Sequence, residues 1–470
     1  MKKVTCKLKI VSPLYLGGAD PKTTVSTPNG QAIKSMMRFW FRAMLGGIIP
    51  DITIAELNSL EGGVFGDTSN SPLRITFSVK KQPEQVTFLG KGNPAERLYG
   101  IEYIGYPLKN RRAFMPGNHS EADAELSLTF CQSYKWLYEM VLSSLWMALH
   151  LGGFGARSRR GFGRMRCHAI ENMPSLDGLP DFSLPPQFDG LNKFYEDNFK
   201  KIEKIFKEYA EKNQIEPGKK IQSNRIKTIF DKPSSLNLPP YSCLRAGCWQ
   251  IAIISKDDWT TLSKTMDDMG KTYRHFRTLG GIEGDDEYAR TKDYNDYVKY
   301  FLPSPEGEAD GKWRHHLLRT AVGTGRWNPR NDVLGLPYRI QSKSRAEEIS
   351  PGKWVDLSVQ IGWIDNDYRN NKKKYFHRAS PLLFGPLQLH NKYAVIALGL
   401  KSKFFPEDLG KEILIHSGRR WNRLQDHNLF DNNYEWRRFQ NIEPVDDKDV
   451  SSVLDEFMKF LKLEEKTMLP

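Results

Sequence analysis

One stretch, residues 152–164, reads Gly152-Gly153-Phe154-Gly155-Ala156-Arg157-Ser158-Arg159-Arg160-Gly161-Phe162-Gly163-Arg164. It joins a helical run of Leu, Met and Trp at 134–151 to an alternating run at 164–170. Glycine adopts left-handed backbone at no steric cost and lets another chain come close. Arginine carries a planar, permanent charge that fits phosphate oxygens. The stretch therefore predicts a cradle for a polyanion. The alternative is a helix C-cap followed by an ordinary surface loop.

The polyanion expected there is not a nucleotide cofactor. A phosphate-binding loop of the Walker type ends in Gly-Lys-Ser/Thr, which is missing here, and a dinucleotide-binding loop follows a strand rather than a helix. The sequence therefore predicts no cofactor. The candidate binding residues in the stretch are Gly153, Gly155, Arg157, Arg159, Arg160, Gly161, Gly163 and Arg164.

A second basic feature lies near the N-terminus. Residues 4–10 alternate apolar and polar side chains, which is typical of a half-buried strand. Residues 31–45 follow with helical periodicity, and Lys34, Arg38 and Arg42 are spaced four apart, so they form one basic line on the helix. We expect this line to form the second wall of the same groove. A solvated helix face is the alternative.

Several motifs occur in a characteristic order. They are Leu16-Gly17-Gly18, the run Ile33-Lys34-Ser35-Met36-Met37-Arg38-Phe39-Trp40-Phe41-Arg42-Ala43, then Val64-Phe65-Gly66-Asp67, then the glycine loop of residues 152–163. In this order they resemble the RAMP superfamily of CRISPR-associated proteins, and the Lys-x-x-x-Arg-Phe-Trp-Phe-Arg-Ala run is most similar to the first-named subunit of Cmr-type (type III-B) effector complexes. Leu334-Gly335-Leu336-Pro337 and Arg378-Ala379-Ser380-Pro381-Leu382 are also similar to that subunit. The resemblance implies ferredoxin-like domains, membership of a complex that contains guide RNA, and no catalytic role.

The predicted fold class is α+β, with two ferredoxin-like (RRM-like) domains, a helical insertion and a C-terminal helix. The first domain is expected over residues 1–172, where strands alternate with helices and 81–125 reads as an inserted loop or hairpin. Residues 173–240 are expected to be a Pro-rich linker with a helical insertion. The second domain is expected over 241–440. An acidic helix is expected at 441–470, docked on protein rather than on RNA.

The net charge indicates an acidic partner. Lys and Arg number 69 against 56 Asp and Glu, which gives +13 over 470 residues. A positive field speeds encounter with polyanions, so nucleic acid is the first expected partner and an acidic protein surface the second. Aromatic residues interleave with basic clusters between 314 and 438, as suits single-stranded RNA, although separate loops with core aromatics would give the same pattern.

Cysteine spacing and hydropathy exclude other classes. The five cysteines form no Cys-x-x-Cys pair, so no metal site is expected. No apolar run approaches the ~18–20 residues of a membrane span, and the basic N-terminus does not read as a signal peptide. The sequence therefore predicts a cytoplasmic protein.

Candidate catalytic groups are scattered. His315 and His316 are adjacent, His275 and His377 lie in other basic segments, and no histidine falls inside the glycine loop. We therefore expect no catalytic residues and a non-catalytic RNA-binding subunit of a type III-B CRISPR antiviral ribonucleoprotein, in contact with guide or target RNA and with other Cmr-type subunits. The alternatives are a metal-independent endoribonuclease acting on guide RNA and a protein-only scaffold of the same complex.

Overall fold

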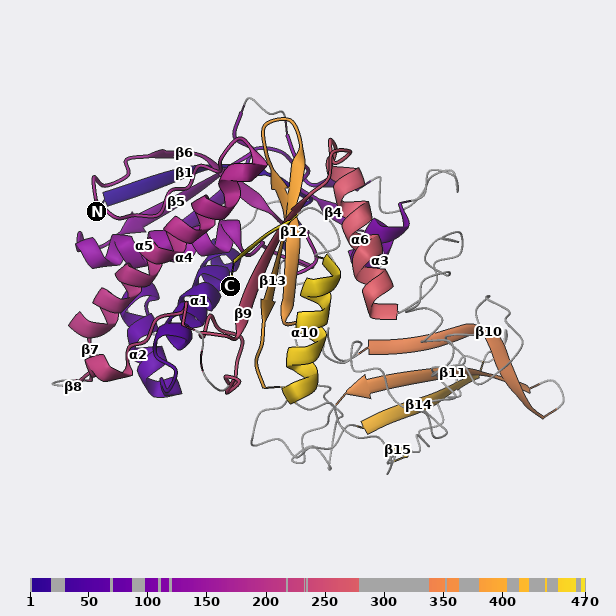
Figure 1. Ribbon diagram of the computed structural model, residues 1–470. Helices are drawn as coiled ribbons and strands as arrows, with labels where there is room; N and C mark the ends of the chain where they lie inside the picture. Colours follow the sequence, from indigo (N-terminus) through magenta and orange to yellow (C-terminus); the bar gives the residue numbers. More distant parts are fainter. Residues whose placement is uncertain are drawn as a thin grey trace. The chain divides into compact units, whose positions relative to one another are not determined.

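The structure is a computed structural model. It describes residues 2–17, 30–67, 71–86, 98–108, 111–117, 121–216, 219–231, 233, 236–278, 338–350, 353–362, 380–403, 414–421, 436–437, 447–461 and 466–469. The described chain is a mixed α+β structure, as the sequence predicts (Figure 1).

The first sheet is built from four antiparallel strands in the order β2-β5-β1-β6. Along the chain its elements are β1 (Lys2–Ile10), α1 (Gln31–Ile48), α2 (Ile54–Phe65), β2 (Leu73–Val79), β5 (Ala124–Phe130), α4 (Lys135–His150) and β6 (Met165–Glu171). This is the β-α-β-β-α-β succession of a split βαβ unit. The glycine-arginine loop, residues 152–164, joins helix α4 to the edge strand β6.

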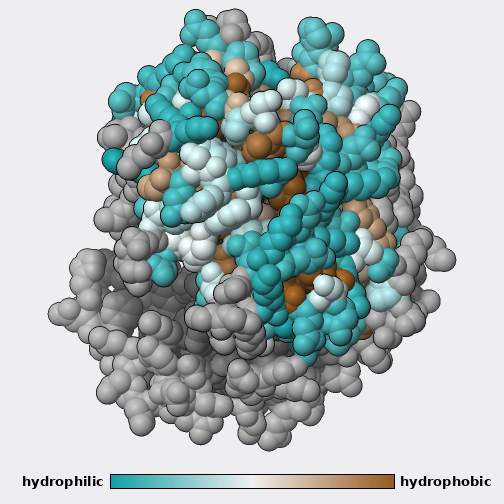
Figure 2. Space-filling view, turned by 90° about the vertical axis from the view of Figure 1, so that its left-hand side faces the viewer, coloured by the Kyte–Doolittle hydropathy of each residue, from teal (hydrophilic) through white to brown (hydrophobic). Residues whose placement is uncertain are grey.

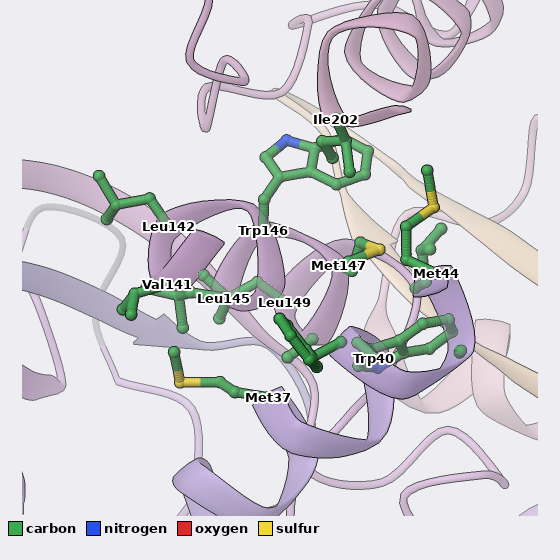
Figure 3. Close-up of a cluster of buried hydrophobic side chains, with 14 of the residues drawn as sticks. Met37, Trp40, Met44, Val141, Leu142, Leu145, Trp146, Met147, Leu149 and Ile202 are labelled. Carbon is green, nitrogen blue, oxygen red and sulfur yellow. The ribbon is translucent and has the colours of Figure 1, made fainter. Parts of the chain in front are cut away.

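A helical layer covers one face of this sheet (Figure 1). Cys6 and Leu8 of β1 are fully buried, which places the apolar half of the alternating run toward that layer. In α1, Met37, Trp40 and Met44 recur at helical spacing and lie against the apolar side chains of α4 (Figure 3). The sheet and both helices therefore share one hydrophobic core.

A second sheet repeats the same succession and order. Its strands β12-β13-β9-β16 are antiparallel. The elements are β9 (Trp249–Ser255), α6 (Leu262–Thr278), β12 (Leu382–Gln388), β13 (Tyr393–Leu400), α10 (Asp447–Leu461) and β16 (Lys466–Leu469). Because β16 pairs with β9, the C-terminal segment is the last helix and strand of this sheet unit rather than a separate helix at 441–470.

The segment between the two sheets contributes helix α5 (Leu191–Lys212), as expected for the helical insertion. Its apolar face is buried, and Phe199 packs on Trp249 with ring centroids 5.1 Å apart. Smaller elements are β3 (Glu84–Gln85), α3 (Tyr99–Gly105), the 3₁₀ turns η3 (Tyr106–Leu108), η4 (Phe188–Gly190) and η5 (Ser223–Arg225), β4 (Arg112–Ala113), β7 (Gln214–Glu216) and β8 (Lys219–Lys220). Figure 2 shows one face of the molecule, on which hydrophobic residues appear only between hydrophilic ones.

The chain divides into two compact units. One contains residues 1–273, 382–402 and 456–470, and the other contains 274–381 and 403–455. The second unit holds a sheet ordered β10-β11-β14-β15, with β10 (Tyr338–Ser350), β11 (Lys353–Gly362), β14 (Leu414–Trp421) and β15 (Trp436–Arg437). The predicted boundaries at 172 and 240 therefore do not separate compact units, because one core runs from β1 through α5 to β9 and β13.

Candidate nucleic-acid interface

The glycine-arginine loop is held by its own backbone against the segment that follows β1. The amide of Ala156 donates to the carbonyl of Tyr15 at 2.9 Å, and the amide of Gly163 donates to the carbonyl of Pro13 at 2.9 Å. Across the loop, the amide of Phe154 donates to the carbonyl of Gly163 at 2.9 Å. These amides are used inside the protein, so the loop is less a backbone cradle than a firmly tied platform for its side chains.

The loop's glycines are required by the fold itself. Gly155, Gly161 and Gly163 have φ angles of 78°, 86° and 68°. A Cβ on Gly155 would overlap the carbonyl oxygen of Tyr15, and one on Gly163 would overlap that of Phe154. Gly153, Gly161 and Gly163 are buried. Of the four predicted glycines, only Gly155 is therefore exposed on the surface.

Three arginines form the tip of the loop, and each is half-exposed. Arg157 has a left-handed φ of 60°, and its carbonyl accepts the amide of Arg160 at 2.8 Å, which closes a tight turn. The Arg159 guanidinium lies 5.2 Å from the ring centre of Phe39 in α1. The Arg160 guanidinium lies 4.4 Å from that of Tyr273 in α6. Aromatic faces thus fix two of the three cations in place.

Arg159 keeps its charge although it is partly buried. Burial lowers the pKa of Arg159 to about 10, which is still far above neutral pH. The tip is also tied to the second sheet, because the amide of Phe384 in β12 donates to the carbonyl of Arg159 at 3.2 Å. The arrangement presents three clustered guanidinium groups on a rigid support, which is chemistry suited to phosphate.

Arg164 is a correction to the predicted site. It is 2% exposed, and its Nη1 donates to the carbonyl of His150, the last residue of α4, at 3.2 Å. A cation at a helix C-terminus is stabilised by the exposed carbonyls and the helix dipole. Gly385 of β12 lies against this guanidinium so closely that a Cβ there would overlap it. Arg164 therefore stabilises the end of α4 and is not accessible to RNA.

The basic line on α1 has a different set of contacts. Arg38 Nε lies 3.3 Å from one carboxylate oxygen of Glu61 in α2, and Arg42 Nε lies 3.4 Å from the other. Arg38 also donates to the carbonyl of Gly66, at the C-terminus of α2. Lys34 Nζ donates to the hydroxyl of Ser71 at 3.0 Å. All three cations are half-exposed, and all three contact α2 or the segment after it.

Helix α1 does meet the loop, but with other residues. Phe39 lies under Arg159, and a Cβ on Gly152 would come 2.6 Å from the indole nitrogen of Trp40. Glu61 offsets the charge of Arg38 and Arg42, while burial raises the pKa of Glu61 against the influence of the two arginines. The second wall of a shared groove, predicted to be Lys34, Arg38 and Arg42, is therefore an ion-paired surface turned toward α2.

Two described histidines lie near the loop in the chain, His150 before it and the exposed His168 after it in β6. His150 is buried, and burial lowers its pKa to about 3, so it stays neutral.

Within the described residues no group of three or more His, Cys, Asp or Glu side chains is placed to hold a metal ion. No described helix is long and apolar enough to cross a bilayer. His315, His316, His377 and the side chain of His275 lie outside what the structure describes, as do Gly18 and most of the basic clusters between 314 and 438.

The loop, α1 and β1 fall within one recognisable sequence region. Residues 7–166 match the model of the RAMP superfamily. This region is similar to the RAMP superfamily. The predicted resemblance to this superfamily and to Cmr-type subunits is confirmed by the relatives described next.

Two curated proteins from Pyrococcus furiosus are similar to this chain in sequence. CRISPR system Cmr subunit Cmr1-2 is 25% identical over 181 residues, which cover 35% of this chain and 95% of that relative. CRISPR system Cmr subunit Cmr1-1 is 26% identical over 237 residues, which cover 50% of this chain and 61% of that relative. The crystal structure of Cmr1 from the same organism, in its apo form, has a TM-score of 0.51 and 15% identity, covering 100% of this chain and 98% of that one. At this identity the match shows a shared fold.

The residues that hold the cations of the glycine-arginine loop and of α1 in place were not predicted from the sequence. Phe39, Tyr273 and Glu61 each contact a predicted cation, yet they lie up to 120 residues away in the chain. No local pattern points to them, because the contacts depend on how α1, α2 and α6 pack. A further set, Tyr99, Tyr103 and Tyr106, was readable from its spacing but was hidden in the segment interpreted as an inserted loop.

Proposed function

We propose that this chain is a non-catalytic RNA-binding subunit of a type III-B CRISPR ribonucleoprotein, and that Arg157, Arg159 and Arg160 contact the phosphates of guide or target RNA. The observation that supports the proposal most is the placement of the Arg159 guanidinium over Phe39 and of the Arg160 guanidinium over Tyr273. Phosphate contacts of this kind position a nucleic acid without reading its sequence. The relatives' names support membership of a Cmr complex, with other Cmr subunits as partners. The compartment that we propose is the cytoplasm.

A non-catalytic role is supported by the burial of His150, the histidine that precedes the loop. His150 lies at the base of the loop, but it is enclosed and its pKa is lowered to about 3, so it cannot exchange a proton near neutral pH. A cleavage assay on single-stranded RNA, run with and without EDTA, tests this role. Intact RNA is expected under both conditions, and cutting would favour the endoribonuclease alternative.

The binding role is tested at Arg157. Arg157 forms no part of the two aromatic stacks. Arg157→Ala is expected to weaken single-stranded RNA binding by about 10- to 150-fold, since charge-assisted contacts contribute about 1.5–3 kcal/mol, and the melting temperature shows that the variant is folded. Fluorescence anisotropy with labelled oligouridylate measures the affinity. Lys212→Ala is the control, because Lys212 is the last residue of α5 and its side chain is 72% exposed. Equal affinity for Arg157→Ala and wild type would contradict the assignment.

A further inference from the structure

Three tyrosines line one side of a short helical segment. Tyr99 and Tyr103 belong to α3 and Tyr106 begins η3, so the residues are four and three positions apart and fall on a common face. Tyr106 is 74% exposed, which is unusual for a large aromatic side chain. The opposite face consists of buried residues, namely Ile101, Ile104 and Leu108. We call Tyr99, Tyr103 and Tyr106 the tyrosine face.

The segment that carries the tyrosine face is firmly anchored. The carboxylate of Asp267 in α6 accepts the amides of Gly100 at 2.7 Å and Ile101 at 3.3 Å. Asp267 is buried and also pairs with Lys271 at 2.9 Å. Gly100 and Gly270 meet backbone to backbone, and a Cβ on either would overlap the other helix. The tyrosines thus stand on a rigid base, which lowers the conformational entropy lost when they bind.

The tyrosine face continues into the arginine tip. The ring centroid of Tyr103 lies 6.1 Å from that of Tyr273, and Tyr273 in turn lies beneath the guanidinium of Arg160. The rings of Tyr103 in α3 and Tyr273 in α6 and the guanidinium of Arg160 in the glycine-arginine loop therefore lie next to one another.

Further arginines follow the tyrosine face in the chain. The amide of Arg111 donates to the carbonyl of Leu108 at 2.9 Å, which fixes Arg111 at the end of η3. Arg112 in β4 is exposed. Two residues later, Phe114 exchanges backbone hydrogen bonds of 3.0 Å with Leu14, beside the Tyr15 carbonyl that holds the loop. Two arginines thus follow the three tyrosines in the chain.

We propose that the tyrosine face stacks the bases of the same single-stranded RNA whose phosphates the arginine tip holds, with Tyr106 and Tyr99 as the stacking rings and Arg112 as an added phosphate contact. This rests on the proposed function above. Every base has a π-face, so stacking of this kind tolerates any sequence. Exposed tyrosines also occur at protein interfaces. RNA is favoured because Tyr103 adjoins Tyr273, over which the Arg160 guanidinium lies, and because Arg111 and Arg112 follow the tyrosines in the chain; single strands need both aromatic and cationic contacts.

The test measures the affinity of the full-length protein for two polymers. One is labelled oligouridylate, and the other is an abasic ribose-phosphate strand of the same length and charge. Tyr106→Ala is expected to weaken binding to the base-bearing strand by about 5- to 150-fold, the range for one lost stack. The same variant is expected to bind the abasic strand like wild type. Tyr106→Phe keeps the ring and is expected to bind both like wild type.

Tyr134→Ala is the matched control. Tyr134 is 52% exposed and stacks on Trp136 with centroids 5.8 Å apart at the start of α4. It is expected to leave both affinities unchanged, and equal melting temperatures show that every variant is folded.

The possible failures are distinguishable. If wild type binds neither strand, the proposed function itself fails. If wild type binds both strands and Tyr106→Ala changes neither affinity, the loop binds RNA but the tyrosine face does not. If Tyr106→Ala leaves RNA affinity intact and instead weakens co-purification of the neighbouring complex subunit, the face binds protein and the stacking proposal is overturned.

Discussion

Two arginines in the glycine-arginine loop, seven positions apart, have opposite roles. Arg157 stands on a left-handed backbone at the tip, whereas Arg164 is enclosed beneath the C-terminus of α4. The sequence alone does not distinguish Arg157 from Arg164, because both follow glycine-rich sequence and both carry the same charge. What distinguishes them is Gly385, more than 200 residues later, which makes room for the Arg164 guanidinium. The sequence could therefore predict the basic loop but not which of its cations faces outward.

Trp40 in α1 belongs to the hydrophobic core, in contrast to the arginines near it. It follows Arg38 by two positions, is fully buried, and lies between α4 and Gly152 (Figure 3). Trp40→Ala is expected to lower the free energy of unfolding by about 3–5 kcal/mol because it leaves a large cavity. Chemical denaturation measures this change, with Ile54→Ala at the exposed start of α2 as a control expected within about 0.5 kcal/mol. A Trp40→Ala protein of normal stability that has lost RNA binding would mean that Trp40 serves the interface.

At the scale of elements, helix α2 gives a pH-dependent prediction. Glu56 closes a capping box with Thr53 and accepts from Arg225 at 2.8 and 2.9 Å. The bonds from Arg225, above all, lower the pKa of Glu56 to about 2 from an ordinary 4.5. A lowered native pKa stabilises the fold fully above about 4.5, and this stabilisation is lost as the pH falls toward 2.

Arg225→Gln removes the hydrogen bonds that lower the pKa of Glu56, and with them this pH-dependent stabilisation. We expect wild type to exceed the variant in unfolding free energy at pH 6, and the difference to shrink between pH 4.5 and 3. Denaturation curves at several pH values measure it. Lys212→Gln, which breaks an exposed pair with Glu208, is expected to change little at any pH. A wild-type advantage over Arg225→Gln that stays constant from pH 6 to 3 would contradict the role given to Glu56.

Elements with strong periodicity were predictable. Leu73, Ile75, Phe77 and Val79 alternate with polar residues, which is typical of a strand, and this run forms β2 (Leu73–Val79). The predicted helix at 31–45 is α1, three residues longer. Strand β5 and helix α2 were missed. Ala124, Leu126, Leu128 and Phe130 do alternate, but the glycine, proline and charge of the preceding segment concealed where the loop ends. In α2, Gly62 and Gly63 weaken the helical pattern, and the capping box is the signal that would have identified it.

For the whole molecule, the sequence indicates the α+β class but not the grouping of its parts. The second sheet has β9 and α6 in one stretch of chain and β12, β13 and β16 more than 100 residues later. Long insertions are inexpensive in loop-closure entropy, so they leave little trace in local patterns. The acidic C-terminal segment therefore reads as an independent helix, although its final strand completes a sheet.

The claim that this chain holds single-stranded RNA by phosphate contacts is tested most directly by the salt dependence of binding. Each neutralised phosphate contributes a log–log slope of about −0.7 for single strands. Three to five arginine contacts then predict a slope of about −2 to −3.5 for the purified full-length protein with oligouridylate. That slope is expected to become shallower by about one contact in Arg157→Ala. A slope near zero, or one that Arg157→Ala leaves unchanged, would contradict the account.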